Sequence, residues 1–283
     1  MALFSIDGAT KLTGLIGSPV THSRSPAIHQ YWLQEHTINA RYLAFEVAAN
    51  NLKEAVKGAA ALGFLGLNVT VPYKERVLDF VNSIEEDARY MGAANTLIFS
   101  GGNIHAANTD VYGIVANLTQ DGRCLAQLMK RVMILGAGGA ARAAVAACAQ
   151  MGAVEIRLCN RTLENARALA KTVQMPVEIV PWHLRESALE GASLLINTTS
   201  LGMKNTAALD LDLAVLPPDA LVHDIVYAPL HTDLLQRAKT RGNPVLTGIG
   251  MLAYQAQKAF ELWHGVRPAV TDALLVMAAG NNT

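Results

Sequence analysis

A short apolar run that ends in a glycine-rich turn constrains this chain more than any other feature. Val132–Leu135 is followed by Gly136-Ala137-Gly138-Gly139-Ala140-Ala141 and then by an alanine-rich helical pattern. This order of strand, G-x-G-x-x-A turn and helix is typical of a dinucleotide-binding unit. Gly136 would make the tight turn, Gly138 would let the backbone approach a pyrophosphate, and Ala141 would let the helix pack closely on the strand. We therefore expect the phosphates of a cofactor at this helix N-terminus.

The end of the next expected strand bears on which dinucleotide binds. Such a unit usually carries Asp or Glu about 20 residues after the glycines, where the carboxylate binds the ribose 2′-hydroxyl. Here the strand Val154–Cys159 runs into Asn160-Arg161-Thr162, which offers a guanidinium and no carboxylate. Because a guanidinium favours a 2′-phosphate, the sequence predicts NADP(H) in preference to NAD(H). The alternative is a glycine turn in an α/β protein that binds no dinucleotide.

Composition narrows the class of protein and the partners it takes. The chain has 283 residues, is 51% hydrophobic and 16% charged, and balances 23 basic against 23 acidic residues. This length allows two domains with sizeable cores, and zero net charge gives no reason to expect nucleic acid or a membrane as partner. We expect no secretory signal, no membrane-spanning segment and no metal site. Cys124, Cys148 and Cys159 lack metal-like spacing and are expected to be reduced thiols in a cytoplasmic protein.

Strand and helix patterns alternate on both sides of the glycine turn. Before it, the expected strands are Leu12–Gly17, Arg41–Val47, Leu65–Val71 and a hairpin of Asn95–Phe99 with Asn103–Ala107, and the expected helices begin at Ser25-Pro26 and span Leu52–Leu62. After it, the expected strands are Glu155–Cys159, Val177–Val180, Leu194–Asn197, Leu221–Ile225 and Val245–Thr247, followed by helices over Met251–Trp263 and Thr271–Met277. Ser25 and Asp110 are expected as helix N-caps.

This alternation predicts an α/β protein of two domains. A Rossmann-type domain with a doubly wound parallel sheet would bind the dinucleotide over residues 117–248. An N-terminal α/β domain over residues 1–116 would bind the substrate. The C-terminal helices, residues 249–283, would return to complete that substrate domain.

Four polar clusters interrupt the apolar patterns and are candidates for a substrate site. They comprise Asn68, Thr70 and Lys74; Asn95 with Asn108-Thr109-Asp110; Ser23 with Ser25; and Gln255. Asn68 and Thr70 share one face of a strand, and Lys74 follows just beyond the strand end, where α/β ligand sites form. Ser23 and Ser25 at a helix start could hold an anion such as a carboxylate. Taken singly, each cluster has a simpler explanation as a helix cap or a solvated surface.

Taken together, these clusters resemble the shikimate dehydrogenase family over essentially the whole chain. The matching motifs are Ser23-Arg24-Ser25-Pro26, Asn68-Val69-Thr70-Val71-Pro72-Tyr73-Lys74, Gly92-Ala93-Ala94-Asn95-Thr96-Leu97, Asn108-Thr109-Asp110, the glycine turn, Asn160-Arg161-Thr162, Asn197-Thr198-Thr199-Ser200-Leu201-Gly202-Met203, Asp224-Ile225-Val226-Tyr227, and Gly248-Ile249-Gly250-Met251-Leu252 with Gln255. The resemblance implies reduction of 3-dehydroshikimate to shikimate with NADPH, in the route to chorismate and the aromatic amino acids.

The resemblance also implies roles for individual residues. Lys74 and Asp110 match the catalytic pair of the family, with Lys74 as proton donor and acceptor. The implied substrate-binding residues are Ser23, Ser25, Asn68, Thr70, Lys74, Asn95, Asp110, Tyr227 and Gln255. The implied cofactor-binding residues are Glu86, Gly136, Ala137, Gly138, Gly139, Ala140, Asn160, Arg161, Thr162, Thr199, Ile225, Gly248 and Met251.

Two departures from the family pattern and three alternative functions stay open. Family members often carry a second arginine soon after the Asn-Arg-Thr motif, whereas this chain has Glu164 and Asn165 there, with Arg167 further on, so the preference for NADPH is expected to be modest. Arg24 between the two serines is the other departure. The alternatives are a quinate/shikimate dehydrogenase using NAD or NADP, a methylenetetrahydrofolate dehydrogenase, and a non-catalytic NADP(H)-binding regulatory module. We expect a monomer or a homodimer.

Overall fold

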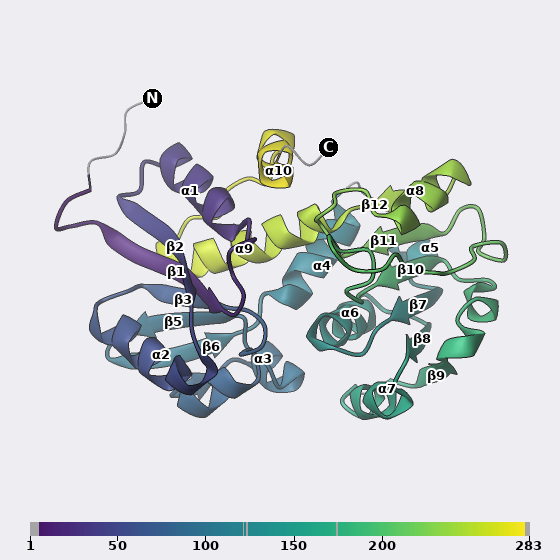
Figure 1. Ribbon diagram of the computed structural model, residues 1–283, viewed down its shortest axis with the longest axis horizontal. Coiled ribbons are helices and arrows are strands. Elements are labelled where there is room, and N and C mark those ends of the chain that lie inside the picture. Colours follow the sequence, from purple (N-terminus) through teal and green to yellow (C-terminus); the bar gives the residue numbers. More distant parts are fainter. Residues whose placement is uncertain (1–5, 121, 123, 174, 281–283) are drawn as a thin grey trace. The chain divides into compact units, whose positions relative to one another are not determined.

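The chain folds into two compact units of mixed helix and strand. Figure 1 shows the computed structural model, which describes residues 6–120, 122, 124–173 and 175–280. Unit 1 contains the chain up to Thr109 and a second segment, Gln255–Ala278. Unit 2 contains Asp110–Tyr254 and the chain from Ala279 on. The first junction lies a few residues before the expected boundary at 116, and the second a few residues after the one expected at 248. The α/β fold class is confirmed, and the division into substrate and cofactor domains stays a prediction.

A six-stranded mixed sheet, in the order β2-β1-β3-β5-β6-β4, forms the centre of unit 1. Its strands are β1 (Lys11–Gly17), β2 (Ala40–Glu46), β3 (Gly66–Val69), β4 (Ser83–Ile84), β5 (Thr96–Ser100) and β6 (Asn103–Ala107). Its other elements are α1 (Ser25–Glu35), η1 (Ala49–Asn51), α2 (Leu52–Ala61), η2 (Arg76–Phe80), α3 (Glu86–Met91), the part of α9 (Gly248–His264) from residue 255 on, and most of α10 (Asp272–Ala279). β1 pairs in parallel with β2 and β3, and the expected β5–β6 hairpin is confirmed as antiparallel.

Three local predictions are wrong by one or two positions. Ser25 is the first residue of α1, because Arg24 occupies the N-cap and Pro26 follows within the first turn. Asp110 is likewise the first residue of its helix. β3 ends at Val69 rather than Val71, since the backbone N–H of Tyr73 donates to the carbonyl of Thr70 at 2.9 Å and closes a turn.

Unit 2 contains the parallel sheet that the glycine turn predicts. The strand order is β12-β11-β10-β7-β8-β9, and each described pairing is parallel. The strands are β7 (Arg131–Leu135), β8 (Glu155–Asn160), β9 (Val177–Pro181), β10 (Leu194–Asn197), β11 (Leu221–Asp224) and β12 (Val245–Leu246). The other elements are α4 (Asp110–Thr119), α5 (Leu125–Leu128), α6 (Gly139–Gln150), α7 (Leu163–Ala170), η3 (Trp182–Leu184), η4 (Ser187–Leu189), α8 (Asp233–Thr240) and the start of α9 (Gly248–His264). The chain order β7-α6-β8-α7-β9, and its return through β10, β11 and β12 on the other side of β7, is doubly wound as expected.

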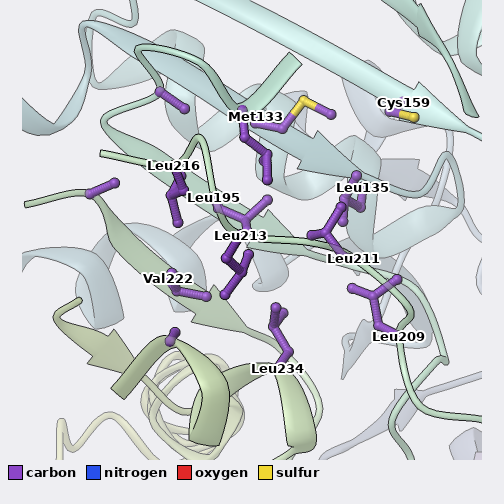
Figure 2. Packing of buried hydrophobic residues seen from close by; sticks show 14 of the residues in the cluster. Met133, Leu135, Cys159, Leu195, Leu209, Leu211, Leu213, Leu216, Val222 and Leu234 are labelled. Atoms are coloured by element: carbon purple, nitrogen blue, oxygen red, sulfur yellow. The ribbon is translucent and has the colours of Figure 1, made fainter. Parts of the chain in front are cut away.

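The core on one face of this sheet is filled by an irregular segment as well as by a helix. Figure 2 shows Met133, Leu195 and Val222 of the strands packed with Leu234 of α8 and with side chains of residues 209–216. Along that segment the buried leucines alternate with more exposed residues although the chain forms no strand there. The alternating leucines of this segment are therefore buried against the sheet, although the segment adds no strand to the sheet.

The structure bears on the expectations for cysteines, membrane spans and metal ions. Cys124, Cys148 and Cys159 are free thiols, and burial raises the pKa of Cys148 to about 12 and that of Cys159 to about 11. Among the described residues no helix is long and apolar enough to cross a membrane. The same residues contain no group of three or more His, Cys, Asp or Glu side chains that could hold a metal ion.

Candidate functional site

A chain of hydrogen bonds runs through the interior of unit 1 and starts from Asn68 on β3. Asn68 is 5% exposed, and its Oδ1 accepts from the hydroxyl of Tyr42 on β2 at 2.8 Å. Its Nδ2 donates to the carbonyl of Asn95 and to Oγ1 of Thr96, both at 3.0 Å. An amide buried in a sheet costs free energy unless such partners satisfy it, so the fold holds Asn68 in one orientation.

Asn95 extends the chain of hydrogen bonds to a distant part of the sequence. Its Oδ1 accepts from the backbone N–H of Thr109 at 2.8 Å, and its Nδ2 donates to Oγ1 of Thr109 at 3.0 Å. The same Nδ2 lies 3.4 Å from Oε1 of Gln255 on α9, within hydrogen-bond reach. The structure therefore brings Asn68, Asn95 and Gln255 together, although they are far apart in the sequence.

Ser23 and Ser25 extend this network beyond Tyr42. The backbone N–H of Ser25 donates to the hydroxyl of Ser23 at 3.2 Å, and Ser25 is buried at the start of α1. Burial raises the pKa of Tyr42 far above its usual value, and a hydrogen bond with the Ser25 side chain opposes that rise. We call the connected set Ser23, Ser25, Tyr42, Asn68, Asn95, Thr96, Thr109 and Gln255 the polar network of unit 1. Tyr42 and Thr96 are the members that lie outside the four candidate clusters of the sequence.

Lys74 and Thr70 lie on the turn that follows β3. The backbone N–H of Thr70 donates to the carbonyl of Ile16 at 3.0 Å, and the carbonyl of Lys74 accepts from the N–H of Ala94 at 2.8 Å. The second bond ties the turn to the residue immediately before Asn95. Lys74 is half-buried. The backbone of Thr70 is thus attached to β1, and that of Lys74 to the residue next to Asn95.

Four other residues expected in the substrate or cofactor site lie outside the polar network. Asp110 follows Thr109 directly and is buried, but it begins unit 2. Tyr227 is half-buried three residues after β11, and Glu86 is exposed at the start of α3 in unit 1. Met251, nearly buried on α9, also belongs to unit 2. The pairing of Lys74 with Asp110 and the roles of the other residues stay predictions.

The glycine turn between β7 and α6 leaves open space where a ligand could lie. Gly136 has φ +108°, and a Cβ there would come within 2.5 Å of Oγ1 of Thr198, so only glycine fits. Gly138 is the N-cap of α6 and forms no side-chain cap. A Cβ on Gly138 or Gly139 would meet nothing within 4 Å, whereas Ala141 is fully buried. The first N–H groups of α6 therefore face space that an anion can fill.

Arg161 lies between the end of β8 and the start of α7. Asn160 donates from Nδ2 to the carbonyl of Thr162 at 2.8 Å, and Thr162 is the N-cap of α7. Arg161 between them is exposed, and its guanidinium has no ion-pair partner in the described part of the chain. Glu164, Asn165 and Arg167 are also exposed on α7.

The segments after β10 and β11 carry further expected cofactor residues. Thr199 donates from both its backbone N–H and its hydroxyl to Oδ1 of Asn197, at 3.0 and 2.7 Å. Gly248 lies so close to Ile225 that a Cβ on it would come within 2.1 Å of the Ile225 carbonyl oxygen. The start of α9 therefore contacts the residue directly after β11, and both are among the residues expected to bind the cofactor.

A buried histidine, His29, adjoins the polar network of unit 1, and a half-buried one, His264, influences it. His29 is fully buried on α1, and its ring stacks on that of Tyr42 with centroids 4.0 Å apart and planes 5° apart. Neither ring nitrogen of His29 has a hydrogen-bond partner among the described residues. Burial, and to a lesser extent the charge of His264, lowers the pKa of His29 well below its usual value, and burial lowers that of His264 to about 4. Both imidazoles are therefore neutral in the folded state at pH 7.

We expect His29→Phe to reduce the sensitivity of the protein to acid. Because both histidines have lower pKa values in the folded than in the unfolded state, the unfolded chain binds more protons below about pH 6.5, and stability falls there. Each histidine would contribute a slope of up to about 1.4 kcal/mol per pH unit until its folded-state pKa is reached. Phenylalanine preserves the stacking and removes one of the two slopes. The free energy of unfolding, measured for both proteins between about pH 5 and 7, should fall more steeply with falling pH for the wild type than for the variant; parallel curves would contradict this account.

Models of known families match three stretches of the chain. A model described as the shikimate dehydrogenase substrate binding domain matches residues 15–97, and one described as shikimate / quinate 5-dehydrogenase matches residues 122–206. A third, described as the shikimate 5'-dehydrogenase C-terminal domain, matches residues 248–273. The first match covers most of the residues of the polar network, and the second covers the glycine turn, Arg161 and Thr199.

Similar proteins span nearly the whole chain. A protein of Paramagnetospirillum magneticum named shikimate dehydrogenase (NADP(+)) is 47% identical over 270 residues, which are 95% of this chain and 98% of that protein. The crystal structure of a shikimate 5-dehydrogenase from Thermus thermophilus in complex with NADP(H) and shikimate has a TM-score of 0.86 at 33% identity and covers 96% of this chain and 100% of its own. A quinate dehydrogenase from Corynebacterium glutamicum in complex with NAD has a TM-score of 0.86 at 29% identity, and the match covers 94% of this chain and 97% of that one.

Proposed function

The chain belongs to the shikimate dehydrogenase family, and from that premise we propose that it reduces 3-dehydroshikimate to shikimate with NADPH, reversibly. It is accordingly an NADP-dependent oxidoreductase that acts on a ring CH–OH group. The observation that carries the proposal is the polar network of unit 1. A small hydroxylated ring carboxylate needs many neutral donors and acceptors fixed in place, and Ser, Asn, Thr and Gln side chains joined by hydrogen bonds supply them.

The residues of unit 2 fit an NADP cofactor. The space above Gly138 and Gly139 and the free N–H groups of α6 suit a pyrophosphate. The exposed Arg161 suits a 2′-phosphate because a guanidinium can bind it in a bidentate manner. When bound, the cofactor supplies a hydride to the carbonyl carbon of the substrate.

Within this proposal Lys74 and Asp110 carry out the proton chemistry. Negative charge develops on the carbonyl oxygen as the hydride arrives, and a positioned proton donor must meet that charge in the transition state. Lys74 would hydrogen-bond this oxygen and deliver the proton. Asp110 would orient the ammonium group of Lys74 and accept a hydrogen bond from a substrate hydroxyl. Ser23 and Ser25 would bind the carboxylate of the substrate, as hydroxyls near a helix start can.

We expect Arg161→Ala to remove most of the preference for NADPH. Loss of a charge-assisted hydrogen bond to the 2′-phosphate corresponds to about 1.5–3 kcal/mol, so kcat/KM with NADPH should fall roughly 10- to 100-fold while kcat/KM with NADH stays nearly unchanged. Arg167→Ala is the matched control, since Arg167 is also exposed but lies further along α7. Equal losses with both cofactors, or a wild-type preference for NAD, would contradict the role of Arg161.

Quinate is the second candidate substrate. The structural relative that is a quinate dehydrogenase, and the family model that includes quinate enzymes, both favour testing it. Quinate carries one more ring hydroxyl than shikimate and lacks the double bond, so only a few contacts can distinguish them. Oxidation of shikimate and of quinate, each with NADP+ and with NAD+, tests the proposal: shikimate with NADP+ should have the highest kcat/KM, and faster oxidation of quinate would assign the other activity.

The free cysteines bear on the compartment in which the enzyme works. We propose a cytoplasmic protein, because three free cysteines fit a reducing compartment. Its small-molecule partners would be the substrate and the cofactor, with no nucleic acid or membrane among them. Either a monomer or a homodimer is compatible with this activity.

A further inference from the structure

Asp224, the last residue of β11, is a fully buried carboxyl group that the proposed chemistry does not use. In the described part of the chain it has no lysine or arginine partner. Burial raises its pKa to about 6, against the opposing effect of hydrogen bonds from Thr232, Val226 and Asn197. Because burying a carboxyl group without a cation is costly, its contacts are expected to serve a purpose.

The contacts of Asp224 reach both segments that leave the carboxyl edge of the sheet. Oδ1 accepts from Nδ2 of Asn197, at the end of β10, at 3.0 Å and from the backbone N–H of Val226 at 3.1 Å. Asn197 in turn accepts both hydrogen bonds from Thr199. Val226 lies between Ile225 and Tyr227. One carboxyl group therefore fixes Thr199 through Asn197 and fixes Ile225 through the neighbouring peptide.

Oδ2 of Asp224 is held independently. It accepts from Oγ1 of Thr232 at 2.6 Å, and Thr232 is the N-cap of α8, where its Oγ1 accepts from the N–H of Leu235 at 3.4 Å. The carboxyl group is thus oriented by a helix on one side and by the two strand ends on the other. Ligands of doubly wound sheets bind outside the carboxyl ends of the strands, where these segments lie.

We propose that Asp224 is a positioning residue for the cofactor, which sets Thr199 and Ile225 through its hydrogen bonds to Asn197 and Val226. The inference rests on the proposed function, since it takes NADPH as the ligand at this edge. It assigns Asp224 no contact with the ligand. Asp224 supplies the geometry of the segments after β10 and β11. It does not supply a charge to the ligand.

The test measures NADPH binding without substrate, from the fluorescence of the bound nucleotide. Asp224→Asn keeps the size of the side chain but turns one acceptor oxygen into a donor, so the Kd for NADPH should rise about tenfold or more. Asp233→Asn is the matched control: it removes the same charge from an exposed neighbour that pairs with Arg237 on α8, and the Kd should change less than about twofold. An unchanged Kd in a folded Asp224→Asn protein would overturn the proposal.

A double-mutant cycle separates positioning from a general loss of stability. If Asp224 acts through Asn197 on Thr199, the increases in Kd caused by Asp224→Asn and Thr199→Val should not multiply in the double variant. If the two increases in Kd do multiply in the double variant, Asp224 does not act on Thr199 through Asn197, and the proposal is overturned. Should Asp224→Asn fail to fold, Thr232→Val, which removes the donor to Oδ2, replaces it in the cycle. If the wild-type protein itself fails to bind NADPH, the proposed function falls and this inference falls with it.

Discussion

Replacing Lys74 by alanine should lower kcat for reduction of 3-dehydroshikimate by roughly 10²- to 10⁴-fold, the usual contribution of a positioned general acid. The KM should change little, because the neutral donors of the polar network, and not Lys74, provide most of the substrate contacts in the proposal. An interaction that is made mainly in the transition state affects kcat in this way. Steady-state kinetics at saturating NADPH measures both quantities.

The control for this variant is Lys57→Ala. Lys57 is an exposed lysine on α2 of the same unit, and its removal should leave kcat within about twofold, as expected for a solvated surface charge. A Lys74→Ala protein with nearly full kcat would exclude Lys74 as the proton donor. A raised KM with unchanged kcat would instead make Lys74 a binding residue.

Replacing Asp110 by asparagine should also lower kcat, by roughly 10²-fold or more, if the carboxylate orients the ammonium group of Lys74. Asparagine keeps the size of the side chain but not the charge that holds the cation. The KM should rise moderately, since the contact with a substrate hydroxyl is weakened. Kinetics and thermal unfolding of the same variant are both needed, because Asp110 has a second possible role.

That second role is structural, because an acidic residue in the first turn of a helix stabilises it by about 0.3–1 kcal/mol. Asp272→Asn provides the matched control, since Asp272 is the first residue of α10 just as Asp110 is of α4. The control should lose a little stability and no activity. If Asp110→Asn behaves the same way, the stabilisation of α4 accounts for Asp110 and its catalytic role is wrong.

Local patterns predicted the sheet of unit 2 well because its central strands, β7 and β10, are buried apolar runs. The glycine turn predicted where β7 ends and α6 begins, and Ala141 is buried as close packing requires. The helix starts at Ser25 and Asp110 were misplaced by one residue. An N-cap differs from the first helical residue only in its backbone angles, which the residue type does not determine.

The polar network was harder to predict because its contacts are not local. Asn68, Asn95 and Gln255 were expected from the resemblance, whereas Tyr42 was not, since an aromatic residue in a strand is ordinarily part of a core. Its hydroxyl meets Asn68 only because β1 lies between β2 and β3 and aligns the three strands. Asp224 likewise belongs to a motif that matches the family, Asp224-Ile225-Val226-Tyr227. Its buried contacts with Asn197 and Thr232 could be recognised only in the folded structure.

The formation of NADPH from NADP+ on addition of shikimate, followed by absorbance, tests the central claim most directly. The account predicts shikimate-dependent NADPH formation by the wild-type protein, and its loss in the Lys74→Ala variant while that variant still binds NADPH. Tight binding of NADPH by the wild-type protein without any turnover of shikimate would contradict the account and would identify the chain as a non-catalytic NADP(H)-binding module.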